Sequence, residues 1–244
     1  MDPAAQKRAA AEAAVEYVEA GTVVGVGTGS TVAFFIAALA ELPPERRPAA
    51  AVASSEGSAA ALRAAGIPVV ELASLLPPAT EAVAADVRPL PLYVDGADEV
   101  DPELRLIKGA GGALTREKVL AAASRLFVCI VDESKLVERL GAAPVPLEVV
   151  PMAAAFVAAR VSARGGRPAA RPGYLTDNGN AVLDVAGLDL SDPEGLEVEL
   201  NAIPGVLECG VFARRRADVA LVGSEPGGQR GARSARVRVL RPGE

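Results

Sequence analysis

The sequence predicts an α/β protein in which a parallel sheet is covered by helices on both faces. Short apolar runs rich in Val, Ile and Leu alternate with helical patterns along the first 133 residues. Uninterrupted apolar strands are typical of parallel sheets buried on both faces. The chain has 244 residues, 50% of them apolar, which suffices for one large domain or for one domain with a small companion.

The expected elements of the first half alternate between strand and helix. A helix over 4–19 comes first, and Gly or Pro marks most of the later boundaries. The expected strands are 22–27, 49–54, 67–72, 91–96 and 126–133, and the expected helices are 31–42, 58–66 and 112–126. The proline-bounded segment 76–91 is not assigned to an element.

The pattern changes near residue 145. A β-α-β-α-β run, with helices expected over 152–163 and 193–202, indicates a smaller α+β unit from about 145 to 212. The apolar run 217–224 is expected to be one more buried strand that rejoins the first sheet. The tail that follows is rich in Gly, Pro and Arg and is expected to fray.

Composition excludes several classes of function. The net charge is −6 and the pI is about 5, which argues against nucleic acid as a partner because phosphate binding needs clustered Lys and Arg. The uncharged stretch 21–40 is long enough to span a membrane, but its glycines and threonines favour a strand, a turn and a helix. Cys129 and Cys209 lie in apolar runs and are interpreted as free thiols of a cytoplasmic protein.

Lysine usage is selective. Only four of the 25 basic residues are lysine, namely Lys7, Lys108, Lys118 and Lys135. Three of them fall between residues 108 and 135. A position that keeps Lys in an Arg-rich chain is one where a planar guanidinium does not serve.

The first candidate motif is VGVGTGSTV, residues 24–32. A strand, glycines, two hydroxyl residues and a helix start form an anion site, because free backbone N–H groups gather at a helix N-terminus. A dinucleotide site would need a further glycine where the chain has Thr31 and Val32. The motif therefore suits a compact phosphate, and a plain tight turn is the alternative.

The second motif is YVDGADEVD, residues 93–101. Asp95 ends a strand, and open α/β sheets bind ligands at the carboxyl ends of their strands. The acid spacing does not fit a calcium loop, and no His or Cys lies nearby, so no metal is expected. Asp95 and Asp98 are the functional candidates, whereas Glu99 and Asp101 are expected to be solvated.

The third motif is IKGAGGALTREK, residues 107–118, and VDESK at 131–135 is the fourth. Lys108 precedes a glycine-rich turn that offers backbone N–H groups, and Glu117 follows on the next helix. Lys135 comes directly after a buried strand. With Asp95 and Asp98 these residues supply a base, proton shuttles, a cation and oxyanion donors, so the chemistry needs neither metal nor cofactor.

The motifs together resemble those of the type A ribose-5-phosphate isomerase family. The matching segments run in family order from about residue 7 to 223. They are GTVVGVGTGST, YVDGADEVD, IKGAGGALTREK, VDESK, LEVVPM, TDNGN, NAIPGV and RRADVALVG. Two departures, the length of segment 76–91 and the extended tail, touch none of these motifs and leave oligomer contacts open.

The resemblance implies a Rossmann-like domain over 1–144 and 213–244, with a ferredoxin-like α+β domain over 145–212 inserted before the last strand. It implies a homodimer that interconverts D-ribose 5-phosphate and D-ribulose 5-phosphate in the pentose phosphate pathway through an enediolate. Glu117 would take the proton, Asp95 would relay a second proton between the sugar oxygens, and Lys108 and Asp98 would assist. The implied substrate-binding residues are Lys7, Thr28, Gly29, Ser30, Thr31, Asp95, Gly96, Ala97, Asp98, Lys108, Gly109, Ala110, Gly111 and Lys135.

Two other functions are compatible with parts of the pattern. A CoA transferase of similar fold uses a glutamate as nucleophile and forms a covalent acyl intermediate. A non-enzymatic sugar-phosphate sensor would lack a placed base and would usually carry a helix-turn-helix, which this acidic chain does not show.

Overall fold

The large sheet positions the candidate motifs. In the computed structural model, which describes residues 2–77, 87–224 and 236–243, six strands pair in the order β13-β12-β6-β3-β1-β2. β13 is antiparallel to β12, and the other neighbours are parallel. The strands are β1 (Val23–Val26), β2 (Ala50–Ala53), β3 (Leu90–Asp95), β6 (Ser124–Asp132), β12 (Val219–Ser224) and β13 (Arg236–Leu240).

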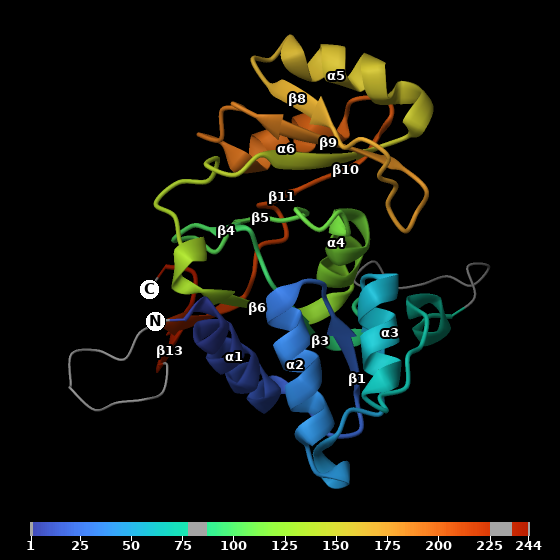
Figure 1. The fold of residues 1–244 in the computed structure, drawn as a ribbon, viewed down its shortest axis with the longest axis vertical. Helices are drawn as coiled ribbons and strands as arrows, with labels where there is room; N and C mark the ends of the chain where they lie inside the picture. The colour runs from blue at the N-terminus through green and yellow to red at the C-terminus, as the bar shows by residue number, and fades with distance from the viewer. Residues whose placement is uncertain (1, 78–86, 225–235, 244) are drawn as a thin grey trace.

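Helices cover both faces of this sheet (Figure 1). Alternate side chains of a strand point to opposite faces, and Leu92 and Val94 pack with α1 (Pro3–Ala14), α2 (Ser30–Glu41) and α3 (Glu56–Ala64). Tyr93 points the other way, into a second core that includes Leu120 of α4 (Leu114–Ala122). The predicted α/β class with a parallel sheet is confirmed.

The helix starts follow from local chemistry. The Asp2 side chain accepts a hydrogen bond from the Ala4 N–H, and Pro3 occupies the first position of α1, where its missing N–H costs nothing. Ser55 caps α3 by accepting from the Ser58 N–H. The shorter 3-10 turns are Val15–Tyr17, Pro44–Arg46, Leu72–Leu75, Glu133–Lys135 and Pro151–Ala153.

A second sheet forms the upper part of the molecule in Figure 1. Its four antiparallel strands pair in the order β10-β7-β9-β8, and two helices separate them along the chain as β-α-β-β-α-β, the ferredoxin-like arrangement. The elements are β7 (Val145–Val149), α5 (Ala154–Ser162), β8 (Arg167–Ala170), β9 (Ala181–Ala186), α6 (Pro193–Asn201) and β10 (Val206–Cys209). We call residues 145–212 the inserted unit; their division from the rest as a domain stays a prediction.

A small sheet lies between the two parts in Figure 1. It contains β4 (Glu99–Val100), β5 (Leu106–Ile107) and β11 (Val211–Phe212), paired in the order β11-β5-β4. Asp98 comes directly before β4, and Lys108 directly after β5. This sheet therefore brings together the second motif, residues 93–101, and the third motif, residues 107–118.

The structure corrects several expected elements. Segment 67–72 forms a single bridge, Val69 to Ala51, instead of a strand. The last strand of the predicted β-α-β-α-β run, VLECGVF at residues 206–212, splits into β10 and β11, which join different sheets, and the run did not include β8. The tail does not fray throughout, because β13 pairs along its whole length with residues 220–224 of β12. Most of segment 76–91 and the tail residues 225–235 lie outside the described residues.

No helix in the described ranges has the length and apolar character needed to cross a membrane. The uncharged stretch 21–40 is instead strand β1, a glycine turn and most of α2, as expected.

Candidate active site

The candidate site lies at the carboxyl ends of β1 and β3. β1 is flanked by β2 on one side and β3 on the other, so the chain order reverses here, where open α/β sheets bind their ligands. A cavity of about 140 Å³ opens at this edge. It is lined by Lys7, Thr28, Gly29, Ser30, Thr31, Gly96, Ala97, Asp98, Lys108, Gly109, Ala110, Gly111, Glu117 and Lys135.

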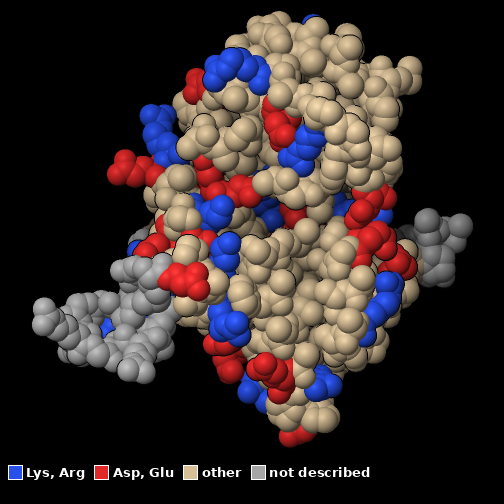
Figure 2. Space-filling model, in the orientation of Figure 1, with Lys and Arg blue, Asp and Glu red and all other residues tan. Residues whose placement is uncertain are grey.

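Every one of these lining residues is a residue that the sequence predicted for the site. The structure therefore brings together four motifs that are spread over 129 positions of the chain, from Lys7 to Lys135. Asp95 is the one predicted residue that does not line the cavity, and it lies directly behind it. Figure 2 shows charged side chains of both signs gathered at the waist between the upper and lower parts of the molecule.

Asp95 is fully buried and saturated with donors. Its Oδ1 accepts from the Thr28 N–H at 3.0 Å and from the Gly96 N–H at 2.7 Å. Its Oδ2 accepts from the Tyr93 hydroxyl and lies 2.7 Å from the Lys108 ammonium. A buried carboxylate is tolerated only with such partners, and here they fix its position against the cavity wall.

Lys108 connects the two buried carboxylates. Its Nζ lies 2.7 Å from Asp95 Oδ2 and 3.1 Å from Glu117 Oε2, and it donates to the Gly96 carbonyl at 2.6 Å. Burial by itself lowers the pKa of Lys108, but the Asp95 and Glu117 carboxylates outweigh this effect and raise the pKa above its ordinary value. The ammonium therefore stays charged across the neutral range.

Glu117 has the properties of a base in a dry site. It stands in the first turn of α4 with only 4% of its surface exposed. Burial and the Asp95 charge raise the pKa of Glu117 to about 8, although Lys108 acts in the opposite direction. Its Oε2 accepts no well-directed hydrogen bond within the described chain, because the Lys108 contact is an ion pair of poor hydrogen-bond geometry. This oxygen has capacity for a proton from a bound molecule.

The opposite end of the cavity suits an anion. Gly29 has φ 116°, a conformation that favours glycine, and it precedes α2, whose first N–H groups receive no side-chain cap. These free N–H groups and the positive end of the helix attract a phosphate. The Lys7 ammonium approaches from α1 and donates to the Ser30 hydroxyl at 3.0 Å.

The glycine-rich turn faces Asp98. The turn is closed by the Gly112 N–H, which donates to the Gly109 carbonyl at 2.8 Å, and the Ala110 N–H donates to Asp98 Oδ2 at 2.9 Å. Lys135 lines the same cavity and makes no ion pair within the described residues. Its ammonium is available to a ligand.

Sequence reasoning missed the residues behind the cavity. The Thr28 hydroxyl lies within hydrogen-bond distance of the hydroxyls of Ser54, Ser55 and Ser58, at 2.7 to 3.2 Å. The Tyr93 hydroxyl donates to Asp95. The sequence held a signal for this contact, because residues two apart on a strand point to the same face. The serines carried no such signal, because only the pairing of β1 with β2 brings them to Thr28.

Two acidic residues differ from expectation. Glu99 is 3% exposed and accepts from the Gly141 and Ala143 N–H groups, and Asp101 is 2% exposed and binds Arg105. Neither is solvated, because both hold loops around β4. Lys118 is also buried, and its Nζ lies 3.0 Å from Glu197 and 2.9 Å from Glu208 in the inserted unit.

The cysteines lie outside the chemistry. Burial raises the pKa of the Cys129 thiol to about 12 and that of Cys209 to about 11, so neither forms a thiolate readily. Within the described ranges, no group of three or more Cys, Asp or Glu side chains could hold a metal ion.

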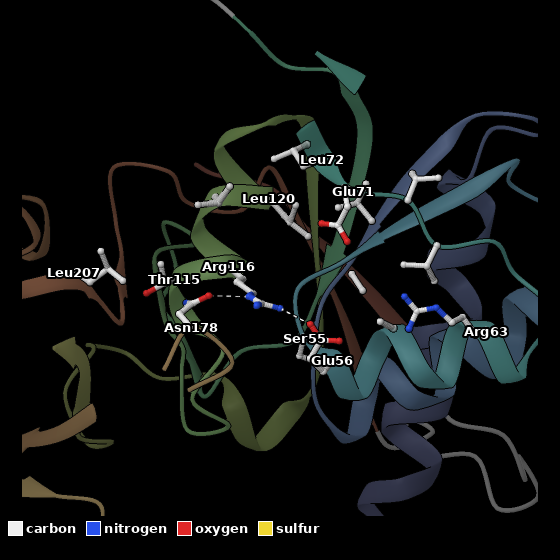
Figure 3. Close-up of a pocket in the computed structure, with 16 residues that line it drawn as sticks. Ser55, Glu56, Arg63, Glu71, Leu72, Thr115, Arg116, Leu120, Asn178 and Leu207 are labelled. Carbon is white, nitrogen blue, oxygen red and sulfur yellow. Dashed lines mark hydrogen bonds and ion pairs between the residues drawn. The ribbon is translucent and has the colours of Figure 1, made fainter. Parts of the chain in front are cut away.

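A larger cavity of about 580 Å³ lies on the other side of α4, between β2 and β10 (Figure 3). One of its charged residues, Arg116, is held by neighbouring side chains. Arg116 donates to Asn178 at 2.9 Å and to Glu56 at 3.1 Å. It contains no buried base comparable to Glu117, so size alone does not identify the site.

Comparison with known proteins agrees with the geometry. The family model described as ribose 5-phosphate isomerase A (phosphoriboisomerase A) matches residues 50–227. Ribose-5-phosphate isomerase A of Bordetella bronchiseptica is 53% identical over 225 residues, which cover 91% of this chain and 93% of that protein.

Solved structures are similar over nearly the whole chain. The ribose 5 phosphate isomerase A of Neisseria gonorrhoeae matches with a TM-score of 0.85 and 43% identity, covering 98% of this chain and 96% of that one. A D-ribose-5-phosphate isomerase in complex with phospho-erythronic acid matches with a TM-score of 0.83 and 35% identity, covering 99% and 100%.

Proposed function

The chain belongs to the ribose 5-phosphate isomerase A family, whose reaction interconverts D-ribose 5-phosphate and D-ribulose 5-phosphate, and we propose that it proceeds through an enediolate formed by Glu117. The observation that carries this proposal is the buried set of Asp95, Lys108 and Glu117. It offers a carboxylate with a free oxygen and a pKa of about 8, beside a charged ammonium.

The substrate is proposed to lie with its phosphate at Thr28–Thr31 and its reacting carbons at Glu117. The free N–H groups of α2 and the Lys7 ammonium supply the positive field that a sugar phosphate needs in an acidic protein. Phospho-erythronic acid, the ligand of the similar isomerase, carries a phosphate at one end and a carboxylate at the other. It can therefore serve as a binding probe, because its planar carboxylate resembles the enediolate.

Glu117 is proposed to remove the proton from C2 of the aldose and to return it to C1. The electron pair of the broken C–H bond forms the C1–C2 double bond, and negative charge develops on O1. The Lys108 ammonium and the N–H groups of the glycine-rich turn stabilise this charge. A carboxyl group whose pKa lies near neutrality can both accept and return the proton, so the chain needs no histidine.

A second proton must move from O2 to O1. This relay was expected of Asp95, but each of its oxygens already has two donors, and it lies behind the cavity wall. Asp98 lines the cavity, and we propose it for the relay. Asp95 then acts through its neighbours, because it anchors Lys108 and raises the pKa of Glu117.

The test is an isotope experiment with purified protein in EDTA. Ribose 5-phosphate labelled with deuterium at C2 should show a primary isotope effect, and label should wash out into solvent through Glu117. Glu117→Gln should show neither turnover nor exchange. Complete retention of the label at C1 together with undiminished turnover by Glu117→Gln would indicate a hydride shift, and loss of activity in EDTA with recovery in Mg²⁺ would indicate a metal; either result overturns the proposal.

Other expectations stay predictions. They are the place of the reaction in the pentose phosphate pathway, the homodimeric state and the cytoplasmic location.

A further inference from the structure

Side chains of the inserted unit donate hydrogen bonds to the backbone carbonyls of the glycine-rich turn, residues 109–112. Arg171, which follows β8, donates to the Gly109 carbonyl at 3.1 Å and to the Ala110 carbonyl at 3.0 Å. The Tyr174 hydroxyl donates to the next carbonyl, that of Gly111, at 3.1 Å. Three successive carbonyls of the turn therefore point toward one side, away from the cavity that the same residues line.

The orientation of a carbonyl fixes the N–H that follows it. A trans peptide places its C=O and N–H on opposite sides, and the described chain contains no cis peptide. The Ala110 carbonyl points at Arg171, so the Gly111 N–H points the other way. The Ala110 and Gly112 N–H groups are already used, by Asp98 and by the turn itself. The Gly111 N–H has no acceptor within the described residues.

Gly111 lies at the cavity wall beside Thr28, since a Cβ on Gly111 would lie 3.9 Å from the Thr28 methyl group. A substrate whose phosphate is held at Thr28–Thr31 would therefore lie close to this N–H. A backbone N–H with no protein partner beside a buried base is the arrangement of an oxyanion donor.

Arg171 is itself held in place. Asp184 on β9 accepts from Arg171 Nε at 2.7 Å and from Nη2 at 2.6 Å, a two-point contact that fixes the guanidinium plane. The hydrogen bond to Asp184 raises the pKa of Arg171. The Arg171 guanidinium also lies 5.6 Å from the centre of the Tyr174 ring. Arg171 makes these contacts through three separate nitrogens, Nε, Nη1 and Nη2, and the single nitrogen of a lysine cannot occupy all three positions.

We propose that Arg171, clamped by Asp184, is a positioning residue that aims the Gly111 N–H at the developing enediolate oxygen. The inserted unit thereby takes part in catalysis although its side chains do not touch the reacting atoms. This inference rests on the enediolate proposed above.

The test compares Arg171→Ala with a matched control, Arg164→Ala. Arg164 lies in the inserted unit too, but it pairs with Glu199 at 3.8 Å within that unit. Loss of one oxyanion donor costs about 10²–10³ in kcat, and a misaligned donor costs less. We expect Arg171→Ala to lower kcat by about 10- to 100-fold with KM changed less than about threefold, and Arg164→Ala to leave both unchanged.

Binding measurements separate positioning from general damage. Arg171→Ala should weaken phospho-erythronic acid by a factor similar to the loss in kcat, and should leave the Kd of inorganic phosphate unchanged. Tyr174→Phe, a milder change that removes only the hydroxyl, should act in the same direction. Arg171→Lys should restore little of the loss, since one ammonium cannot occupy the three nitrogen positions from which Arg171 reaches Asp184 and both carbonyls.

Three results would overturn the inference while leaving the enediolate intact. They are a raised KM with normal kcat, which would make Arg171 a substrate contact, a lower melting temperature with normal kcat, and equal weakening of both ligands. Failure of the underlying mechanism is distinguishable, because it appears as undiminished turnover by Glu117→Gln and not in the Arg171 variants.

Discussion

The pH dependence of kcat/KM tests the central electrostatic feature of the site. A carboxyl group in water ionises near pH 4.5, whereas burial and the Asp95 charge raise the pKa of Glu117 to about 8. The base must be ionised to accept the C2 proton, and kcat/KM reports ionisations of the free enzyme and free substrate. Activity should therefore rise with pH in a range where an ordinary carboxylate would give a flat profile.

The size of the rise follows from the pKa. A group with a pKa of about 8 is ionised to about 9% at pH 7, 50% at pH 8 and 91% at pH 9. We expect kcat/KM to increase about fivefold from pH 7 to pH 8 and less than about twofold from pH 8 to pH 9. The raised pKa of Lys108 keeps the ammonium charged, so no descending limb is expected below about pH 10.

The assay follows ribulose 5-phosphate formation between pH 6.5 and 9.5 at constant ionic strength. Lower pH is avoided because the second ionisation of the substrate phosphate lies near pH 6. Residual activity of Asp95→Asn provides the control: loss of that charge should move the midpoint to lower pH, since Asp95 raises the pKa of Glu117. A profile that is flat from pH 6.5 to 9 would refute either the raised pKa or the assignment of Glu117 as the base.

Four further variants have expected outcomes. Glu117→Gln should lower kcat by about 10²–10⁴-fold without changing the Kd of inorganic phosphate. The difference in melting temperature, Glu117→Gln minus wild type, should increase as pH rises from 5.5 to 9. The raised pKa of the Glu117 carboxyl stabilises the wild-type fold at low pH, and this contribution is lost as pH rises through about 8. Lys108→Arg should lower kcat/KM by about tenfold or more although the charge is conserved. If its activity and its melting temperature equalled those of the wild type, Lys108 would supply only positive charge that an arginine supplies equally well. Ser30→Ala combined with Thr31→Ala should weaken inorganic phosphate in calorimetry, and equal affinities would move the phosphate elsewhere. Lys118→Met should cost about 3–5 kcal/mol in urea unfolding because it strands buried carboxylates, and a loss below about 1 kcal/mol would contradict the structure.

The order of the elements was predictable because strands that are buried on both faces consist mainly of apolar residues. β3, β6 and β12 are buried along most of their length and appear as uninterrupted apolar runs. β8 is a mostly exposed edge strand that contains a proline, and its sequence therefore has no apolar run that predicts a strand. Segment 67–72 has strand composition but only one bridge to the sheet, since composition does not say whether a partner is within reach.

The site was predictable for a related reason. Residues that follow parallel strands meet at one edge, so Thr28 and Asp95 had to lie close together once β1 and β3 were neighbours. What the sequence could not reveal was burial of charge. Glu99 and Asp101 look like a solvated loop, yet Glu99 accepts from the N–H groups of Gly141 and Ala143, and Asp101 accepts from N–H groups of its own loop. Those partners become visible only when the loops are folded.

The retained lysines now have different explanations. Lys108 and Lys118 each place one ammonium among several converging oxygens: Lys108 meets two carboxylates and a carbonyl, and Lys118 meets two carboxylates and two carbonyls at 2.7 to 3.0 Å. A compact ammonium fits such a point, whereas Arg171 forms a planar fork with Asp184. Lys135 makes no ion pair within the described residues, so its retention has no structural reason unless a ligand supplies one.

The position of Lys118 also bears on how α4 is held. Lys118 and Glu117 are adjacent, and neighbours on a helix point in different directions. Glu117 faces the cavity of the large sheet, while Lys118 enters the inserted unit and binds Glu197 and Glu208. The helix that carries the base is thus fixed from the side opposite to its chemistry. Lys118 is therefore one of the contacts that hold the helix of Glu117 in place.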